Sequence, residues 1–270
     1  MPEDHLRHYY KTSQFYLEGL LRKESDYHDT YVRLVRQFVR PGGLILDLGA
    51  GTGASSHALS IDLKTIALDL SHLFLKAGSE RRSPKLFRVV GDSVVLPFKA
   101  GVLKLVGAFE MIEHVRDVES MFQEIDRVLV PGGVVLIISP NMLSPLNAAL
   151  TLVHELRMGV LHRSRLAQVY ESWYRTTQKL LGYSTSFLKQ EVPDRQDLHS
   201  DMDACYLASP VDLKRWFTQR GYRVKRYQRG GRTRLGRFVN WCFGSYAPTI
   251  YFVAQKRSAG TPEPARAESP

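Results

Sequence analysis

The feature of the sequence that most constrains its fold is a short apolar segment that runs straight into a glycine-rich turn. Residues 44–48 read LILDL, and Gly49, Gly51 and Gly53 follow at alternate positions. A short apolar run that ends in glycine is typical of a buried strand in a parallel sheet. Glycines so placed let the backbone turn tightly and approach a ligand without conflict from side chains. The segment therefore predicts a strand followed by a ligand-binding turn.

Strands and helices alternate along much of the chain. Apolar runs of strand length recur between segments with helical spacing, and glycine and proline mark many of the boundaries. Such alternation predicts a Rossmann-like α/β fold, in which a mostly parallel sheet carries helices on both faces. We expect a helix stop at residues 131–133, which read PGG. We expect strands over residues 44–48, 65–70, 86–90, 103–109, 134–139, 222–227 and 249–255, and helices over 71–77, 118–129 and 209–217.

Acidic residues stand at the ends of several expected strands. Asp47 closes the first strand, and Asp69 ends the second, twenty residues after Gly49. A carboxylate at the position of Asp69 can accept hydrogen bonds from both hydroxyl groups of a ribose. Asp92 follows the third strand, where an adenine would sit, and Glu110 follows the fourth. Because open α/β sheets bind ligands at these strand ends, the four acids predict one site.

The spacing of the glycines indicates which nucleoside ligand fits. Nicotinamide and flavin sites favour Gly-x-Gly-x-x-Gly, with a pyrophosphate at the following helix N-terminus. Here the spacing is Gly-x-Gly-x-Gly, with Asp47 just before it. S-adenosylmethionine has no phosphate and carries an ammonium and a sulfonium group, so an acidic residue beside the turn suits it.

Five motifs occur in an order and spacing that resemble a known enzyme family. They are DLGAGTG at 47–53, ALDLS at 67–71, GD at 91–92 with LPF at 96–98, EMIEHV at 110–115 and VLVPGG at 128–133. Together they resemble the class I S-adenosylmethionine-dependent methyltransferases, especially the type 11 group related to ubiquinone and menaquinone biosynthesis methyltransferases. The resemblance covers residues 30–141 and resumes at 205–256. It implies a seven-stranded sheet with an antiparallel last strand, and S-adenosyl-L-methionine as cofactor.

The resemblance also implies which residues contact the cofactor. Glycines after a strand are often only a tight turn, but acids in register with them favour a binding site. The family pattern carries contacts over to Asp47, Gly49, Gly51, Asp69 and Asp92. We add their neighbours at the same strand ends, which are Ala50, Gly53, Leu70, Ser93 and Glu110.

Two histidines are candidates for a general base. Methyl transfer is an in-line displacement, so the protein has mainly to align donor and acceptor, and a base helps only where the acceptor loses a proton. His114 is the first candidate and His199 the second. His114 has the alternatives of a hydrogen-bonding core histidine or a pocket-lining residue, and Glu113 that of an acid favoured by a helix N-terminus. We expect no metal, although Glu110 with Glu113 and His114 leaves a divalent ion as an alternative.

The sequence divides into five segments. The pattern of alternating elements breaks after the fifth expected strand, where amphipathic helical spacing takes over, and resumes near Ser209. No motif of the family matches this interruption, so the acceptor pocket cannot be carried over from the resemblance. The final residues are rich in Ala, Pro, Glu and Ser, which predicts disorder. We expect an N-terminal helical segment at 1–40, a cofactor-binding core at 41–141, a helical cap at 142–204, the C-terminal part of the core at 205–257 and a disordered tail at 258–270.

Positive charge is concentrated near the C-terminus. The net charge is +10, and residues 214–257 hold twelve Lys or Arg and no acid, so the remaining residues sum to −2. A small-molecule acceptor, methylated at oxygen or carbon, is favoured by the resemblance. One alternative is an RNA acceptor bound through residues 214–237, although several aromatic residues there occupy expected core positions. Another is a lipid acceptor at an anionic membrane surface, and a solvated basic face accounts for the charge equally well. The aromatic residues of the first alternative are Trp216, Phe217, Tyr222 and Tyr227, and those of the second are Phe238, Trp241 and Phe243.

The cysteines and the apolar runs bear on location. Cys205 and Cys242 form no Cys-x-x-Cys pair and cannot build a disulfide framework. A reducing, cytoplasmic setting therefore fits best. The longest apolar stretch, residues 133–153, is interrupted by prolines and asparagines, which predicts a core strand and a helix instead of a bilayer span.

Overall fold

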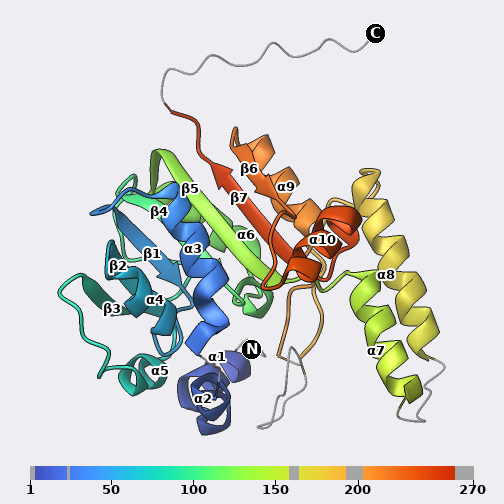
Figure 1. Cartoon of the computed structure of the whole chain (residues 1–270), viewed down its shortest axis with the longest axis horizontal. Helices are drawn as coiled ribbons and strands as arrows, with labels where there is room; N and C mark the ends of the chain where they lie inside the picture. Colours follow the sequence, from blue (N-terminus) through green and yellow to red (C-terminus); the bar gives the residue numbers. More distant parts are fainter. Residues whose placement is uncertain (1–3, 23–24, 158–163, 193–202, 259–270) are drawn as a thin grey trace.

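The computed structural model describes residues 4–22, 25–157, 164–192 and 203–258. Within these residues, the centre of the molecule is a seven-stranded sheet with the order β3-β2-β1-β4-β5-β7-β6 (Figure 1). The strands are β1 (Leu44–Leu48), β2 (Lys64–Asp69), β3 (Leu86–Val90), β4 (Leu103–Phe109), β5 (Leu129–Pro140), β6 (Arg223–Tyr227) and β7 (Thr249–Gln255).

The pairing of the strands confirms the fold expected from the sequence. β1 pairs in parallel with β2 and β4, while β3 extends the parallel sheet beyond β2 and β5 extends it beyond β4. β7 is antiparallel to both of its neighbours, β5 and β6. The last strand therefore enters the sheet between two earlier ones, as the resemblance implies.

β5 begins earlier than the sequence indicated. Helix α6 (Val118–Val128) leads directly into the strand at Leu129, so residues 131–133 lie inside β5 and do not form the expected helix stop. The pairing of β5 with β4 shifts register between Leu103 and Leu105. A shift of this kind takes up extra residues without ending the strand. The Pro-Gly-Gly segment is therefore accommodated as an irregularity of the ladder.

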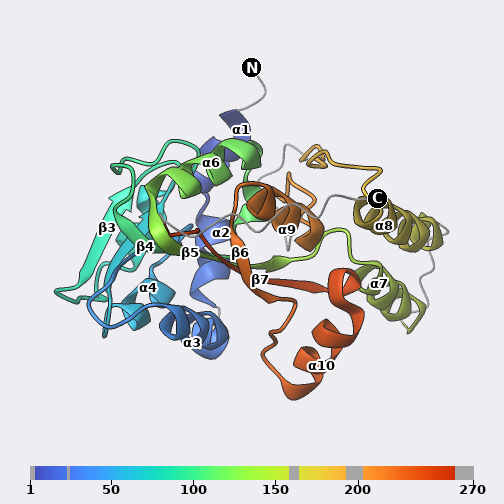
Figure 2. The same ribbon diagram turned by 90° about the horizontal axis from the view of Figure 1, so that it is seen from above.

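Helices cover both faces of the sheet (Figure 2). Successive strand residues point to opposite faces, so neighbouring positions join different cores. Val35 and Leu59 of the first helix layer pack on one face, and Phe122 and Phe217 of the second pack on the other. Together with α6, the helices of these layers are α3 (Asp29–Phe38), α4 (Ala54–Leu59), α5 (His72–Ala77) and α9 (Pro210–Gln219).

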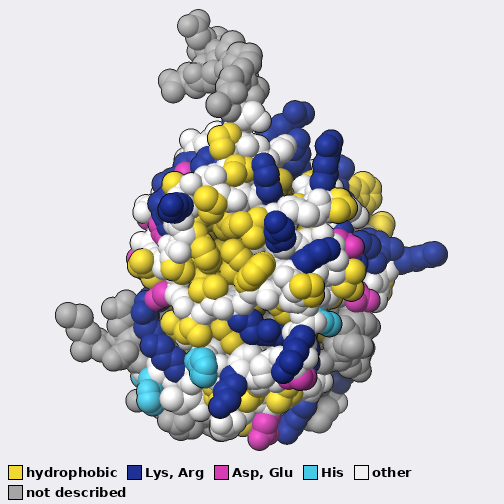
Figure 3. All heavy atoms as spheres, turned by 90° about the vertical axis from the view of Figure 1, so that its left-hand side faces the viewer, with side chains coloured by type: hydrophobic (Ala, Val, Ile, Leu, Met, Phe, Trp, Pro, Cys, Tyr) yellow, Lys and Arg dark blue, Asp and Glu magenta, His cyan; other side chains and the backbone are white. Residues whose placement is uncertain are grey.

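The edge strand β3 is less well covered than the rest of the sheet. The connection from β3 to β4, residues 91–102, is described throughout and forms no helix. Phe87 and Val95 are consequently exposed. Figure 3 faces this edge and shows apolar side chains gathered among Lys and Arg.

The N-terminal segment contains two short helices before α3. It forms α1 (Asp4–Thr12) and α2 (Gln14–Leu21), and Ser13 between them accepts a hydrogen bond from the Tyr16 amide at 3.1 Å. This N-cap bond satisfies one of the free amides at the start of α2 and sets the angle between the two helices. Both helices contribute side chains to the pocket described below.

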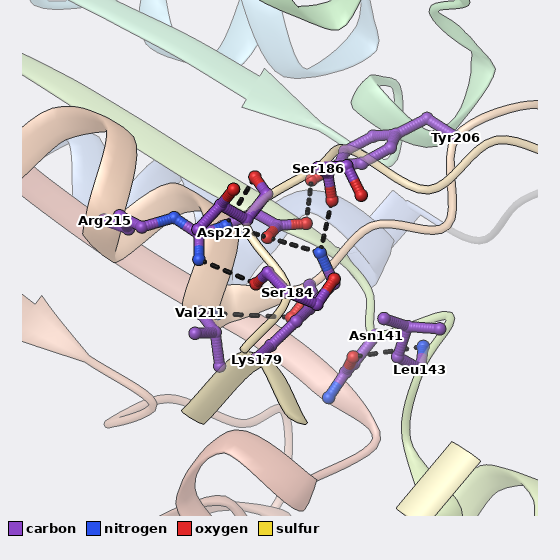
Figure 4. A network of polar contacts seen from close by, with 11 residues as sticks. Asn141, Leu143, Lys179, Ser184, Ser186, Tyr206, Val211, Asp212 and Arg215 are labelled. Atoms are coloured by element: carbon purple, nitrogen blue, oxygen red, sulfur yellow. Dashed lines mark hydrogen bonds and ion pairs between the residues drawn. The ribbon is translucent and has the colours of Figure 1, made fainter. Parts of the chain in front are cut away.

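Two further helices, α7 (Pro145–Arg157) and α8 (Ser164–Leu180), follow β5 and extend away from the sheet (Figure 1). A buried ion pair between Lys179 of α8 and Asp212 of α9 joins them to the core (Figure 4). We continue to treat residues 142–204 as a helical cap, as a proposal. The expected tail lies outside the described residues, except for Ser258.

One helix was not expected from the sequence. Residues 234–243 form α10 (Arg234–Phe243), which is followed by a 3-10 turn, η3 (Gly244–Tyr246). Glycine in a helix costs about 1 kcal/mol relative to alanine, and Gly236 lies inside α10. The helix starts at an N-cap, where the Thr233 side chain accepts from the Gly236 amide at 3.0 Å.

Several aromatic residues near the basic segment belong to the core. Trp216, Phe217 and Tyr222 are at most 4% exposed and pack with Phe122 and Phe252. Buried rings cannot stack on nucleic acid bases, so these three residues cannot serve an RNA site in that way. Within the described part of the chain, no helix has both the length and the apolar character needed to cross a bilayer.

Candidate functional site

A pocket lies at the carboxyl ends of β1, β2 and β4. The glycine turn after β1 lines it, together with residues of α1 and α2. Its lining includes Gly49, Asp69, Asp92, Glu110 and His114, which follow or end four different strands. The strand ends predicted from the sequence thus converge on one cavity.

Gly49 lies where the turn passes closest to the loop after β4. Its φ of +72° is a conformation that residues with a side chain rarely adopt. A Cβ added there would lie 2.2 Å from Cγ of Met111. Only glycine therefore allows the turn and the Met111 segment to approach so closely.

Asp47 is buried beside the turn, and its carboxylate accepts three hydrogen bonds. Its carboxylate accepts hydrogen bonds from Tyr31 at 2.7 Å, Ser55 at 2.7 Å and Ser56 at 2.5 Å. Burial raises the pKa of this carboxyl, and the three hydroxyl donors oppose the rise. Gly107 makes room for the arrangement, because a Cβ there would lie 2.1 Å from the Tyr31 hydroxyl. Asp47 thus ties β1 to α3 and α4 under the pocket.

Asp69 presents its carboxylate at the pocket wall. The amides of Gly51 and Ser71 donate to it at 2.7 and 2.8 Å. Burial raises the pKa of this carboxyl, and the two backbone donors act against that rise. Each carboxylate oxygen has two lone pairs, so the group can still accept bonds from a ligand with paired hydroxyls.

Asp92 and Ser93 line the pocket beyond Asp69. The Asp92 carboxylate forms an ion pair with Arg7 of α1 at 2.6 Å. The Asp92 carboxylate also accepts from the Val94 amide at 3.1 Å, which fixes the loop after β3. The N-terminal helix is therefore linked to the wall where an adenine was expected.

Glu110 follows β4 in a conformation rare for a residue with a side chain, with φ at +48°. Strained positions of this kind cluster at functional sites. Tyr27 of the 3-10 turn η1 (Ser25–His28) donates a hydrogen bond to its carboxylate. This contact holds Tyr27, an aromatic residue of the N-terminal segment, at the pocket.

His114 lies between two carboxylates. Its Nδ1 is 3.2 Å from Oδ2 of Asp203, and its Nε2 is 3.7 Å from Oε1 of Glu113. Although Asp203 is this close, Nδ1 is buried and forms no hydrogen bond with the described residues. Asp203 also accepts from the Tyr10 hydroxyl at 2.7 Å. The histidine is thus held by side chains from both ends of the chain.

Glu113 is almost fully buried beside the histidine. Its Oε2 accepts from the Ser139 hydroxyl at 2.9 Å, while its Oε1 accepts no hydrogen bond from the described residues. Burial raises the pKa of this carboxyl to about 7, against the opposing effect of His114. The backbone carbonyl of Glu113 accepts from the amides of Cys205 and Tyr206, which brings the neighbouring Asp203 into place.

An aromatic wall forms the side of the pocket that the sequence did not reveal. Tyr10 and Tyr16 meet the His114 ring edge-on, with centroids 5.8 and 6.5 Å away, and Tyr16 stacks on Phe74. The abundance of tyrosine in the first forty residues was the available signal, but no motif connected it to the site. Cys205 also lines the pocket, and burial raises its pKa to about 11, so it is no nucleophile at neutral pH.

The residues predicted from sequence can be placed one by one. Gly53 does not line the pocket and serves as N-cap of α4 with φ at +73°. His114 lines the pocket, whereas His199 lies outside the described residues. Among the described residues, no group of three or more His, Cys, Asp or Glu side chains is placed to hold a metal ion. The other predicted cofactor residues all line the pocket: Asp47, Gly49, Ala50, Gly51, Asp69, Leu70, Asp92, Ser93 and Glu110.

Comparison with known proteins matches part of this chain to methyltransferases. A family model described as a methyltransferase domain matches residues 46–137. A demethylmenaquinone methyltransferase of Mycolicibacterium gilvum is 39% identical over 94 residues, covering 34% of this chain and 40% of the relative. A norajmaline N-methyltransferase of Rauvolfia serpentina is 33% identical over 102 residues, covering 35% of each chain. The matches thus span well under half the length of these relatives.

Solved structures share the fold over most of the chain. An S-adenosylmethionine-dependent methyltransferase from Mesorhizobium loti superposes with a TM-score of 0.55 at 14% identity, covering 89% of this chain and all of that one. A geranyl diphosphate C-methyltransferase from Streptomyces coelicolor gives 0.53 at 13% identity, covering 90% and 84%. At such identities the likeness shows the fold alone. Taken with the family match over residues 46–137, it supports a class I S-adenosylmethionine-dependent methyltransferase of the type 11 group.

Proposed function

We propose that this chain transfers a methyl group from S-adenosyl-L-methionine to a small-molecule acceptor, at an oxygen or a carbon atom. The observation that carries the proposal is the Asp69 carboxylate, held at the pocket wall by the Gly51 and Ser71 amides beside the glycine turn. The relatives, named for demethylmenaquinone and norajmaline, support a small-molecule acceptor.

The pocket offers a place for each part of the cofactor. Asp69 would accept bonds from the two ribose hydroxyls, while Asp92 and Ser93 would lie beside the adenine. The turn at Gly49 and Gly51 would hold the methionine portion, over the buried negative charge that Asp47 provides. Since three hydroxyls already occupy the Asp47 carboxylate, this residue mainly fixes the turn. The cofactor, when bound, supplies a methyl carbon activated by the adjacent sulfonium charge.

His114 is the proposed proton acceptor for a hydroxyl or carbon-acid acceptor. It lines the pocket near the glycine turn, and an acceptor of this kind must lose a proton as it is methylated. Asp203 is the proposed positioning residue, because it lies 3.2 Å from Nδ1 of the histidine and is itself held by Tyr10. The aromatic wall of Tyr10, Tyr16 and Phe74 would exclude water from the reacting atoms.

Calorimetric titration with S-adenosylmethionine, and with NAD as control, tests the proposal. We expect binding of S-adenosylmethionine alone. Asp69→Ala should lower the affinity about tenfold or more, because each hydroxyl left unpaired costs about 1–3 kcal/mol. Asp62→Ala, which removes a carboxylate paired with Arg36 on the surface, should leave the affinity unchanged. Binding of NAD alone would overturn the proposal, and an unaltered Asp69→Ala variant would overturn the role of that residue.

The proposal also covers the class of acceptor and the location of the protein in the cell. A nucleic acid acceptor is not favoured, because Trp216, Phe217 and Tyr222 are core residues. A cytoplasmic location is proposed from the cysteines, which are both free, with Cys205 buried and Cys242 exposed. Fractionation of cells that produce the tagged full chain would test the location.

A further inference from the structure

The outer side of α10 joins basic and apolar side chains on a surface that belongs to no site described above. We call this surface the α10 face, and it consists of Arg234, Leu235, Arg237, Phe238 and Trp241. All five side chains are exposed, with Leu235 at 71%, Phe238 at 58% and Trp241 at 63%. At 100° per residue they occupy one side of the helix. α10 therefore turns its large apolar residues toward solvent, the reverse of an ordinary surface helix.

The opposite side of α10 fixes this orientation. Asn240 is 3% exposed and donates to the Gly230 carbonyl at 3.0 Å. The backbone of Gly231 approaches the helix so closely that a Cβ there would lie 2.5 Å from the Arg237 amide. These contacts hold the helix against its own preceding loop, so the apolar side chains cannot turn inward without breaking them.

The charge around the α10 face has one sign. The sequence from Leu213 to Pro262 contains no Asp or Glu, and Arg229 and Arg232 are exposed just before the helix. Such a surface attracts an anionic partner. It also disfavours a symmetric dimer through α10, because a two-fold interface would bring two positively charged faces together.

We propose that the α10 face docks the protein on the surface of a bilayer that contains anionic lipids. Leu235, Phe238 and Trp241 would enter the boundary between headgroups and acyl chains, where aromatic side chains are favoured. Arg234 and Arg237 would contact the lipid phosphates. The bases of an RNA could stack on the two rings but give no reason for an exposed leucine beside them, whereas a bilayer does.

The loop that leads into α10 reaches the lining of the pocket. The guanidinium of Arg232 lies 5.2 Å from the centre of the Tyr27 ring, and Tyr27 lines the pocket. The segment just before the α10 face is therefore linked to one wall of the pocket. The inference concerns binding alone and does not depend on the reaction that the pocket catalyses.

Co-sedimentation of the full chain with vesicles tests the proposal. The vesicles are phosphatidylcholine alone, or phosphatidylcholine mixed with phosphatidylglycerol, at about 0.15 M salt. We expect the protein to pellet only with the anionic vesicles. Arg234→Ala with Arg237→Ala should lower the partition coefficient about fivefold for each arginine. Phe238→Ser with Trp241→Ser should lower it about tenfold or more.

Matched variants serve as controls, each verified as folded by circular dichroism. Arg82→Ala with Lys99→Ala removes the same charge from exposed positions near β3, and should pellet like the wild type. Tyr170→Ser with Trp173→Ser removes two exposed rings from α8, and should also pellet normally. An equal loss in either control would overturn the assignment to α10. So would failure to pellet with anionic vesicles, including the case in which the protein binds a single-stranded RNA oligonucleotide instead.

Discussion

Glu113 is a buried carboxyl in the site, and burial raises its pKa. Its carboxyl has a pKa of about 7, raised by burial from an ordinary value of 4.5. The folded protein therefore holds this proton more tightly than the unfolded chain does. It follows that the contribution of Glu113 to stability is complete below about pH 4.5 and is lost as the pH rises through 7.

Glu113→Gln should remove this dependence on pH. The variant cannot ionise at this position. Between pH 4.5 and 8, the unfolding free energy of the wild type should therefore fall by about 3 kcal/mol relative to that of the variant. Urea denaturation at several pH values measures the difference. Glu119→Gln, at an exposed position, should follow the wild-type curve. Parallel curves for wild type and Glu113→Gln would show that the carboxyl titrates normally in the folded state.

A side chain at position 49 should have two effects, which are backbone strain and crowding against Met111. Gly49→Ala adds strain at φ +72° and a close contact with Met111, so it should lower both stability and affinity for S-adenosylmethionine. Gly42→Ala is the matched control, because its φ is +80° but nothing lies within 4 Å of the added Cβ. The control should lose about 1 kcal/mol of stability and no affinity. Thermal melts and calorimetric titration measure the two quantities, and equal affinities for the two variants would refute the crowding argument.

At the scale of elements, the attachment of α8 to the core depends on a buried ion pair. Lys179 donates to Asp212 and to the Ser186 carbonyl, both at 2.7 Å, and Arg215 donates to the same carboxylate at 3.0 Å (Figure 4). Burial lowers the pKa of Lys179, while Asp212 opposes that change. Tyr206 donates to the other oxygen of Asp212 at 3.2 Å, so the network also reaches the segment that carries Asp203.

Lys179→Met should destabilise the protein by about 3–5 kcal/mol, the usual cost of breaking a buried ion pair. The lower end is expected, because Arg215 still pairs with Asp212. Replacing both partners, as Lys179→Met with Asp212→Leu, should recover part of the loss. Arg175→Ala, in a half-exposed pair with Glu171, should cost less than about 0.5 kcal/mol. Urea denaturation of the wild type and the three variants measures these differences. A loss of stability in Lys179→Met no larger than that in Arg175→Ala would show that the buried pair contributes little.

The sequence predicted some elements well because their signals are local. Strands 44–48, 86–90 and 103–109 are short, mostly apolar runs with glycine or proline close by, and they were located to the residue. The wall formed by Tyr10 and Tyr16, by contrast, depends on contacts with residues about a hundred positions away. Asp203 beside His114 depends on backbone bonds across a similar separation. No short sequence pattern encodes such contacts, so the aromatic wall and Asp203 could be recognised only in the structure.

At the scale of the whole molecule, the two halves of the chain are interleaved. β7 inserts beside β5 and pairs with it from Val134 to Pro140, and Phe252 contributes a fully buried side chain to the main core. The segment that matches the methyltransferase family model, residues 46–137, ends inside β5. That segment therefore carries the cofactor motifs without the strand that completes the sheet.

A chain that ends at residue 141 should consequently fail to fold on its own. Its β5 would become an edge with exposed backbone groups and uncovered apolar side chains, which promotes aggregation. It would also lack Asp203 and the amides of Cys205 and Tyr206 that bind the Glu113 carbonyl. We expect no cooperative unfolding transition and no binding of S-adenosylmethionine for residues 1–141, whereas a chain of residues 1–258, which keeps every described residue, should show both. Calorimetry and urea denaturation of the two chains decide the matter. A cooperative transition with intact affinity in the shorter chain would mean that the first half is an autonomous domain and that β7 only extends it.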